Sequence, residues 1–74
     1  MAGISYRPTG RFRVRDARGV EYWAIETTEF LSVSGESIWI PGRKSYCLED
    51  GTPLTAAGAD RFLDATREVL TRIK

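Results

Sequence analysis

Three arginines near the start of the chain have the residue type and the spacing to bind an anion. Arg11, Arg13 and Arg15 alternate with Phe12 and Val14. In an extended strand, this alternation places the arginines on one face and the two apolar side chains on the other. Guanidinium groups form forked hydrogen bonds with phosphate and carboxylate groups. The pattern therefore predicts a strand that packs on a core with one face and could contact an anionic partner with the other.

Other cationic and aromatic residues extend this candidate binding surface. Arg43 and Lys44 follow a Pro-Gly pair, which is typical of a turn. Trp39 lies between two isoleucines, so in a strand it faces away from both of them. An outward tryptophan belongs either to a contact surface or under a covering loop. The candidate binding residues are Arg11, Arg13, Arg15, Trp39, Arg43 and Lys44.

The chain lacks the residues that most catalytic and metal sites use. It contains no histidine and one cysteine, so it cannot build a Ser-His pair, a Cys-His pair or a structural zinc site by itself. Glu26 and Glu29 are an odd number of residues apart, so a regular strand points them to opposite faces. Glu49 and Asp50 precede a glycine and fit a turn. We therefore predict no enzymatic activity, no catalytic residue, no metal site and no cofactor.

Positive and negative charges are segregated along the chain, although its formal net charge is only +1. Residues 1–20 contain five arginines and one aspartate, whereas residues 21–37 contain four glutamates and no cation. Adjacent blocks of opposite charge are typical of two strands joined by cross-strand ion pairs. The arginines are therefore either paired with Glu21, Glu26 and Glu29 or free to meet nucleic acid, and the charge pattern favours the pairing.

The length and composition predict one small folded domain over residues 1–74. Hydrophobic residues make up 42% of the 74 residues and aromatic residues 11%, enough apolar mass to build a core. The single cysteine, Cys47, suits a reducing cytoplasm, and we expect it to be buried. No apolar run is long enough to cross a membrane, and the N-terminus lacks the apolar stretch of a signal peptide. We therefore expect a cytoplasmic protein that does not contact a membrane.

Short segments rich in strand-forming residues alternate with turn signals. The segment 20–33 is the longest of them and needs a bulge near Glu29 and Phe30 to reconcile its faces. We expect most of the aromatic residues to lie in the core, because a small fold needs its largest side chains inside. Turns are expected at 18–19, 34–35, 41–42 and 50–51, and strands at 11–16, 20–33, 37–40 and 45–49. The fold class is mainly β, as a small antiparallel sheet or partly open barrel of about five strands.

Residues 55–74 fit two structures. As a helix, they place one apolar stripe on a single side, formed by Ala59, Phe62, Leu63, Thr66, Val69, Leu70 and Ile73. As strands, they form a hairpin that turns at Thr66-Arg67. The helix reading is slightly ahead on these residues alone and gives an α+β fold with the helix packed on the sheet. A faint echo links this segment to the first strand, since Arg-Phe is followed by Asp-Ala and then by valine in both.

Several stretches resemble a group of small, functionally uncharacterised bacterial proteins, mostly from proteobacteria. They are residues 10–16 with Gly19 and Tyr22, residues 25–26 with Phe30, residues 41–46 with Leu48, Asp50 and Gly51, and Phe62 with residues 70–73. The resemblance implies further β-structure after Asp50-Gly51, ending in a hairpin with glycine at its turn. Arg67 stands where that glycine is expected, and arginine disfavours the positive φ that such a turn requires. The group carries no known catalytic or binding residues.

The sequence favours a non-catalytic function. The first hypothesis is a protein-interaction or self-associating module, which binds an unknown protein partner or a second copy through a strand edge or the Trp39 surface. The second hypothesis is a small β domain that binds nucleic acid through the face that carries Arg11, Arg13 and Arg15. The near-neutral net charge places nucleic acid behind a protein partner.

Overall fold

The chain folds into six β-strands in a computed structural model that describes residues 3–33 and 38–73. Segments rich in β-branched and aromatic residues form the three long strands, and tight turns separate the three short ones. The strands are β1 (Gly3–Arg15), β2 (Glu21–Ser32), β3 (Trp39–Leu48), β4 (Pro53–Ala56), β5 (Arg61–Leu63) and β6 (Val69–Arg72). The predicted turn at 34–35 lies outside the described residues.

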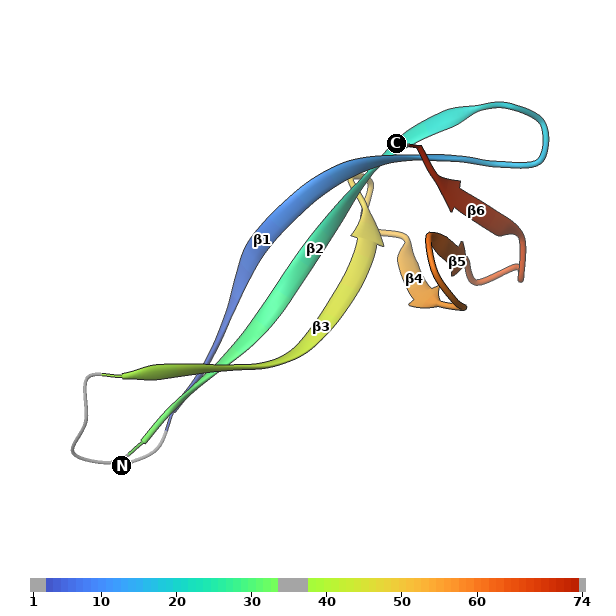
Figure 1. The fold of residues 1–74 in the computed structure, drawn as a ribbon. Helices are drawn as coiled ribbons and strands as arrows, with labels where there is room; N and C mark the ends of the chain where they lie inside the picture. Colours follow the sequence, from blue (N-terminus) through green and yellow to red (C-terminus); the bar gives the residue numbers. More distant parts are fainter. Residues whose placement is uncertain (1–2, 34–37, 74) are drawn as a thin grey trace.

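Each strand pairs antiparallel with the next one in the chain, and β6 pairs with β1 to close a barrel (Figure 1). The predicted mainly β fold is therefore confirmed, with six strands rather than about five. Closure rests on few residues, because β6 meets β1 only at Val14–Arg72 and Arg15–Thr71. A backbone hydrogen bond of 2.9 Å from Ile73 N to Arg13 O extends this seam.

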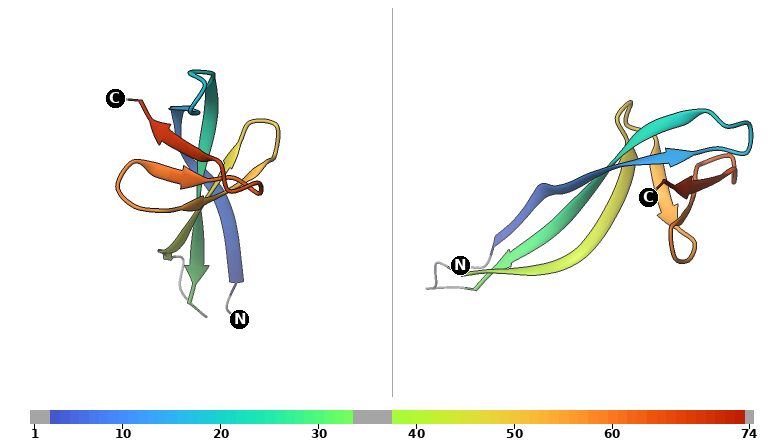
Figure 2. Two further views of the ribbon diagram at one scale, coloured as in Figure 1. Left: turned by 90° about the vertical axis from the view of Figure 1, so that its right-hand side faces the viewer. Right: turned by 45° about the horizontal axis from the view of Figure 1, so that its top comes forward.

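The three long strands run well beyond the small barrel as a twisted ribbon, which we call the arm (Figures 1 and 2). The arm consists of residues 3–8, 27–32 and 39–44, none of which pairs with β4, β5 or β6. It makes the molecule elongated, with principal extents of 50 × 23 × 22 Å. The predicted first strand begins at Arg11, so the prediction missed all of its contribution to the arm.

Two bulges keep one face of the long sheet turned toward the barrel interior. In β1, Thr9 is an extra residue between Pro8 and Gly10, which pair with consecutive residues of β2. In β3, the two residues Gly42 and Arg43 together lie opposite Glu29. The bulge that was expected in the second strand is therefore in its partner strand β3. A Cβ on Gly42 would lie 2.9 Å from Oε1 of Glu29, so a larger residue here would make the Glu29 side chain shift. We call the two sides of the long sheet the inner face and the outer face.

The core fills the barrel from the inner face. Phe12 and Val14 contribute to it from β1, as the alternation predicted. The rings of Phe12, Tyr46 and Phe62 pack together with centroids 5.0–6.1 Å apart. The buried apolar residues are Phe12, Val14, Ala24, Leu48, Leu54, Phe62 and Leu70, with Tyr22 and Tyr46 packed against them.

The C-terminal segment forms strands, so the helical alternative is wrong. Turns interrupt its helical stripe, because the backbone reverses between β4 and β5 and again between β5 and β6. Asp60 and Arg67 adopt positive φ angles of 60° and 64°, which a helix does not contain. The predicted hairpin around Thr66-Arg67 is confirmed, with arginine accommodated at positive φ.

Two local predictions are wrong. Pro41 and Gly42 lie inside β3 at its bulge, not in a turn, so the two strands predicted on either side of them are one strand. Cys47 is half-buried and paired with Ile25 on the outer face, not in the core. The first error arises because the three-stranded sheet continues past the barrel through this bulge. The second arises because strand alternation turns Tyr46 and Leu48 inward and Cys47 outward.

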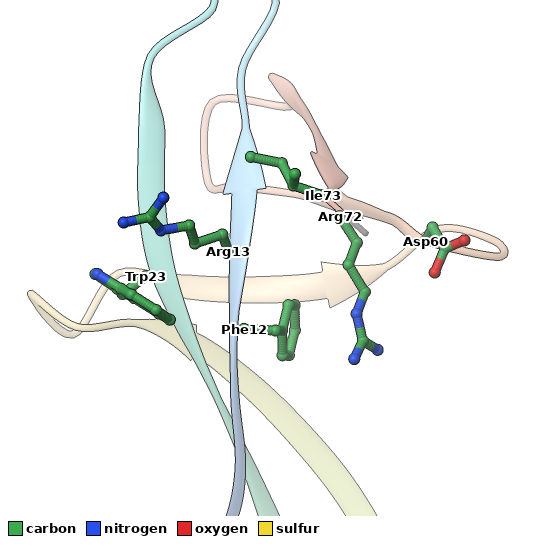
Figure 3. Close-up of a pocket in the computed structure, with 6 residues that line it drawn as sticks. All are labelled: Phe12, Arg13, Trp23, Asp60, Arg72 and Ile73. Atoms are coloured by element: carbon green, nitrogen blue, oxygen red, sulfur yellow. The ribbon is translucent and has the colours of Figure 1, made fainter.

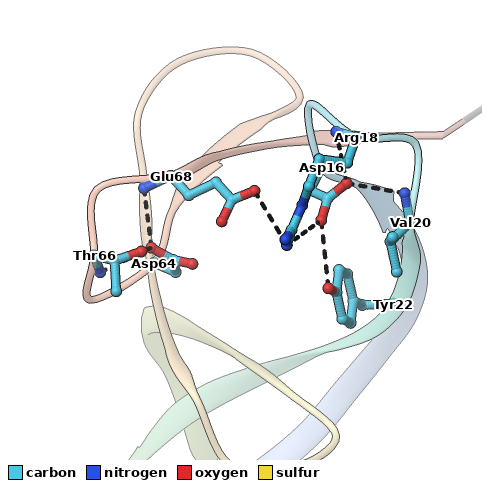
Figure 4. Close-up of polar contacts among 7 residues, drawn as sticks. All are labelled: Asp16, Arg18, Val20, Tyr22, Asp64, Thr66 and Glu68. Carbon is cyan, nitrogen blue, oxygen red and sulfur yellow. Dashed lines mark hydrogen bonds and ion pairs between the residues drawn. The ribbon is translucent and has the colours of Figure 1, made fainter.

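Two aspartates, Asp16 and Asp64, close equivalent hairpin turns at one end of the barrel (Figure 4). Oδ1 of Asp16 accepts hydrogen bonds of 2.9 Å from the backbone of Arg18 and Val20. Oδ1 of Asp64 accepts bonds of 2.8 and 3.0 Å from the backbone of residues 66 and 68. The echo in the sequence therefore marks a repeated turn.

Candidate interaction surface

The three alternating arginines lie on the outer face of the barrel, and two of them stack on Trp23. The Arg11 guanidinium is 3.9 Å from the centre of the Trp23 ring, and that of Arg13 is 4.9 Å from it. Arg11 also donates hydrogen bonds to Oε2 of Glu49, with a distance of 2.9 Å from Nε. Trp23 is thus covered by cations rather than buried in the core.

Arg11, Arg13 and Arg15 form one row on the outer face, which we call the arginine row. Glu21 neutralises the end of this row away from Glu49. Its carboxylate lies 3.3 Å from Arg13 and 3.4 Å from Arg15. The predicted pairing with Glu21 is confirmed, but pairing with Glu26 and Glu29 is wrong. Both of those glutamates lie farther along β2, beyond the arginine row.

Glu26 instead belongs to a polar cluster on the inner face. It accepts a hydrogen bond of 2.8 Å from the Thr9 hydroxyl and lies 3.6 Å from Nζ of Lys44. Thr9 also hydrogen-bonds with buried Thr28 at 2.6 Å. Lys44 therefore faces away from the arginine row and does not join it.

The remaining predicted binding residues are dispersed along the arm. Arg43 lies at the bulge on the outer face, and Trp39 lies on the inner face near the tip. The Arg7 guanidinium lies 5.5 Å from the ring centres of both Phe30 and Trp39. Trp39 does face away from its flanking isoleucines, as predicted, and it stays partly exposed beside the Arg7 guanidinium. The basic residues therefore do not form one continuous surface.

Two hollows lie in the barrel surface. The first is lined by Phe12, Arg13, Trp23, Asp60, Arg72 and Ile73 (Figure 3). Arg72 stacks on the Phe12 ring at 4.5 Å there. The second hollow lies between the two aspartate turns, in which Asp16 and Asp64 are engaged. Its other carboxylates are Asp50, which accepts a hydrogen bond from Thr52, and Glu68, which lies 3.8 Å from Arg18. No group of His, Cys, Asp or Glu in the described ranges could hold a metal ion.

Hydrogen bonds in the turns hold the carboxylates in their charged form. Burial alone would raise the pKa of Asp16, but bonds from Val20 and Arg18 outweigh it and place the pKa below its ordinary value. Bonds from Thr66 and Glu68 likewise lower the pKa of Asp64, and bonds from Thr52 lower that of Asp50. A general acid needs a raised pKa, so these groups fit a structural role.

The outer face of the arm is an exposed apolar patch. Ile4, Leu31 and Ile40 lie directly opposite one another on β1, β2 and β3, with 61%, 38% and 49% of their surfaces exposed. Cross-strand neighbours share a face, so these three side chains form one row. We call the whole set the arm patch: Ile4, Tyr6, Leu31, Val33, Ile38 and Ile40, all exposed.

The sequence reasoning did not identify the arm patch as a unit. The alternation of Ile4 with Tyr6, and of Ile38 with Ile40, was a signal of strands with an apolar face. The register that aligns these residues with Leu31 comes from pairing between distant segments. The alternation within one segment therefore predicts a strand with an apolar face. It does not predict whether another part of the chain covers that face.

The comparisons with protein-family models, curated proteins and solved structures find no match. The resemblance to uncharacterised bacterial proteins therefore stays a prediction. The described ranges contain no helix with the length and apolar character needed to cross a membrane.

Proposed function

We propose that this chain is a non-catalytic protein-interaction module of the cytoplasm, and that its arm patch is the contact surface. The observation that carries the proposal is the row of Ile4, Leu31 and Ile40, which remains exposed on a sheet face without a covering layer. Large apolar side chains grouped on one exposed face favour association with another protein. The barrel at the other end supplies the buried core that holds the sheet together.

Nucleic acid is the second candidate ligand. It is favoured by the three outward arginines, whose side chains are 52–55% exposed. The ion pairs with Glu21 and Glu49 weigh against it, because they reduce the positive charge that would attract phosphate. Exposed pairs contribute only about 0–1 kcal/mol each, so a polyanion could replace them. The arginine row ranks second because the arm patch has no such internal partners.

Site-specific photo-crosslinking tests the proposal. A photoreactive phenylalanine analogue at position 40 reports on the arm patch, and the same analogue at exposed Arg61 on β5 is the matched control. We expect protein adducts from position 40 in the cells that produce the chain, and far fewer from position 61. Adding Leu31→Lys should abolish the adducts, because it places a charge in the central row. Equal labelling at both positions, or none at position 40, would refute the proposal.

A further inference from the structure

We infer that the partner of the arm patch is a second copy of this chain, packed outer face to outer face about a two-fold axis. The inference rests on the proposed function, because it names the occupant of the same surface. Isologous contacts bring the same patch from both subunits together, so the patch must be complementary to itself. Two features of the arm favour that arrangement, and the size of the arm sets its strength.

The edges of the arm are protected against pairing with another strand. Pro41 and the bulge at Gly42 and Arg43 interrupt the free edge of β3. Pro8 and the bulge at Thr9 interrupt the free edge of β1. Proline and bulges are devices that prevent edge-to-edge association. The accessible apolar surface is therefore the face of the sheet, not its edge.

The charges at the base of the arm patch are complementary to each other. Glu29 and Arg43 lie side by side at the β3 bulge, next to Tyr6. Neither forms an ion pair with any residue in the described ranges. A patch that carries one unpaired acid and one unpaired base can match its own copy, since each Glu29 can meet the Arg43 of the other subunit. A face-to-face contact thus brings two ion pairs to the border of the apolar row.

The size of the arm sets the strength of this contact. Three strands about 4.8 Å apart and six residues of about 3.3 Å rise give a face of roughly 14 × 20 Å per copy. Two such faces are smaller than the roughly 1,600 Å² of a standard interface. A contact of this size belongs with weak, transient interfaces, so we expect a dimer that forms only at high concentration.

Reciprocal charge reversal tests the contact directly. Sedimentation of the wild-type chain from about 10 µM to about 1 mM should show a monomer–dimer equilibrium. Glu29→Arg and Arg43→Glu should each weaken self-association about tenfold or more, because each dimer then carries like charges at both positions. An equimolar mixture of the two variants should restore dimers, since every reversed residue meets its complement. Circular dichroism of each variant shows that it is folded.

A matched mixture controls for net charge. Arg61→Glu changes the net charge as Arg43→Glu does, but Arg61 is an exposed residue of β5, away from the arm patch. Arg61→Glu by itself should dimerise as the wild-type chain does, because its contact residues are unchanged. Adding Glu29→Arg to it should give no further dimer, because one of the two charge contacts in a mixed pair still joins like charges. A wild-type chain that stays monomeric at about 1 mM, or variants whose mixture associates no better than either alone, would overturn the inference. Adducts at position 40 with a different protein only would leave the proposed function standing and refute the second copy.

Discussion

Arg67 occupies the same turn position as Gly19. Each is the fourth residue of a five-residue turn, 16–20 for Gly19 and 64–68 for Arg67. Both have a positive φ, 64° for Arg67 and 88° for Gly19. In each turn, the backbone N–H of this residue donates a hydrogen bond to the carbonyl of the aspartate that begins the turn, at 3.0 Å for Arg67 and 3.1 Å for Gly19. Glycine adopts this conformation without strain, whereas arginine does not. The hairpin between β5 and β6 is therefore strained at one residue.

Replacing Arg67 with glycine should stabilise the fold. Arg67→Gly removes the cost of left-handed backbone for a residue with a side chain, and we expect a gain of about 1 kcal/mol in the free energy of unfolding. Gly19→Ala is the matched control and should lose a similar amount, because a Cβ at its φ of 88° is strained. Urea unfolding followed by tryptophan fluorescence measures both. A less stable Arg67→Gly variant would contradict the equivalence of the two turns.

Acid should destabilise the protein through its turn aspartates. The pKa of Asp16, Asp50 and Asp64 is lower in the folded chain than the ordinary value near 4 of the unfolded chain. Their stabilisation is therefore complete above pH 4 and is lost as the pH falls through the folded pKa values. Urea midpoints between pH 7 and pH 2 should decline below about pH 4. Asp64→Asn should unfold more easily at neutral pH and show a shallower decline, whereas an unchanged decline would exclude Asp64 from this effect.

The closing strand should depend on one core residue. Leu70 is 2% exposed, whereas its neighbour Val69 is 47% exposed. Leu70→Ala should cost about 2–5 kcal/mol, because it leaves a cavity where β6 seals the barrel. Val69→Ala should cost less than about 1 kcal/mol, since its side chain already contacts solvent. Thermal unfolding of the two variants compares them, and equal losses would show that β6 is not packed on the core as described.

The arginine row should bind oligonucleotides only at low salt. Its ion pairs with Glu21 and Glu49 must be broken before phosphate can bind. Replacing both glutamates with glutamine should therefore raise the affinity for a single-stranded oligonucleotide in fluorescence anisotropy titrations. Tight wild-type binding near physiological salt, with a salt dependence that Arg13→Ala flattens, would instead make nucleic acid the main ligand.

Much of the barrel was predictable from local patterns. Phe12 and Val14 identified the core face of the first strand, because strand side chains alternate strictly. Asp50-Gly51 was recognised as a turn, and Gly51 has the positive φ of 94° that the turn requires. The helix alternative failed because its apolar stripe also fits two short strands, and only the turns at Asp60 and Arg67 separate the two readings.

The same distinction between local pattern and tertiary structure holds for the candidate interaction surface. The residue types alone determined the alternating arginines, the absence of histidine and the apolar character of Ile4 and Ile40. Only the tertiary structure decided that Glu49, rather than Glu26, pairs with Arg11 and that the isoleucines align with Leu31 on an uncovered face. The alternation depends only on neighbours in the chain. Ion pairing depends on strand register, and exposure of the isoleucines depends on how far the sheet extends beyond the barrel.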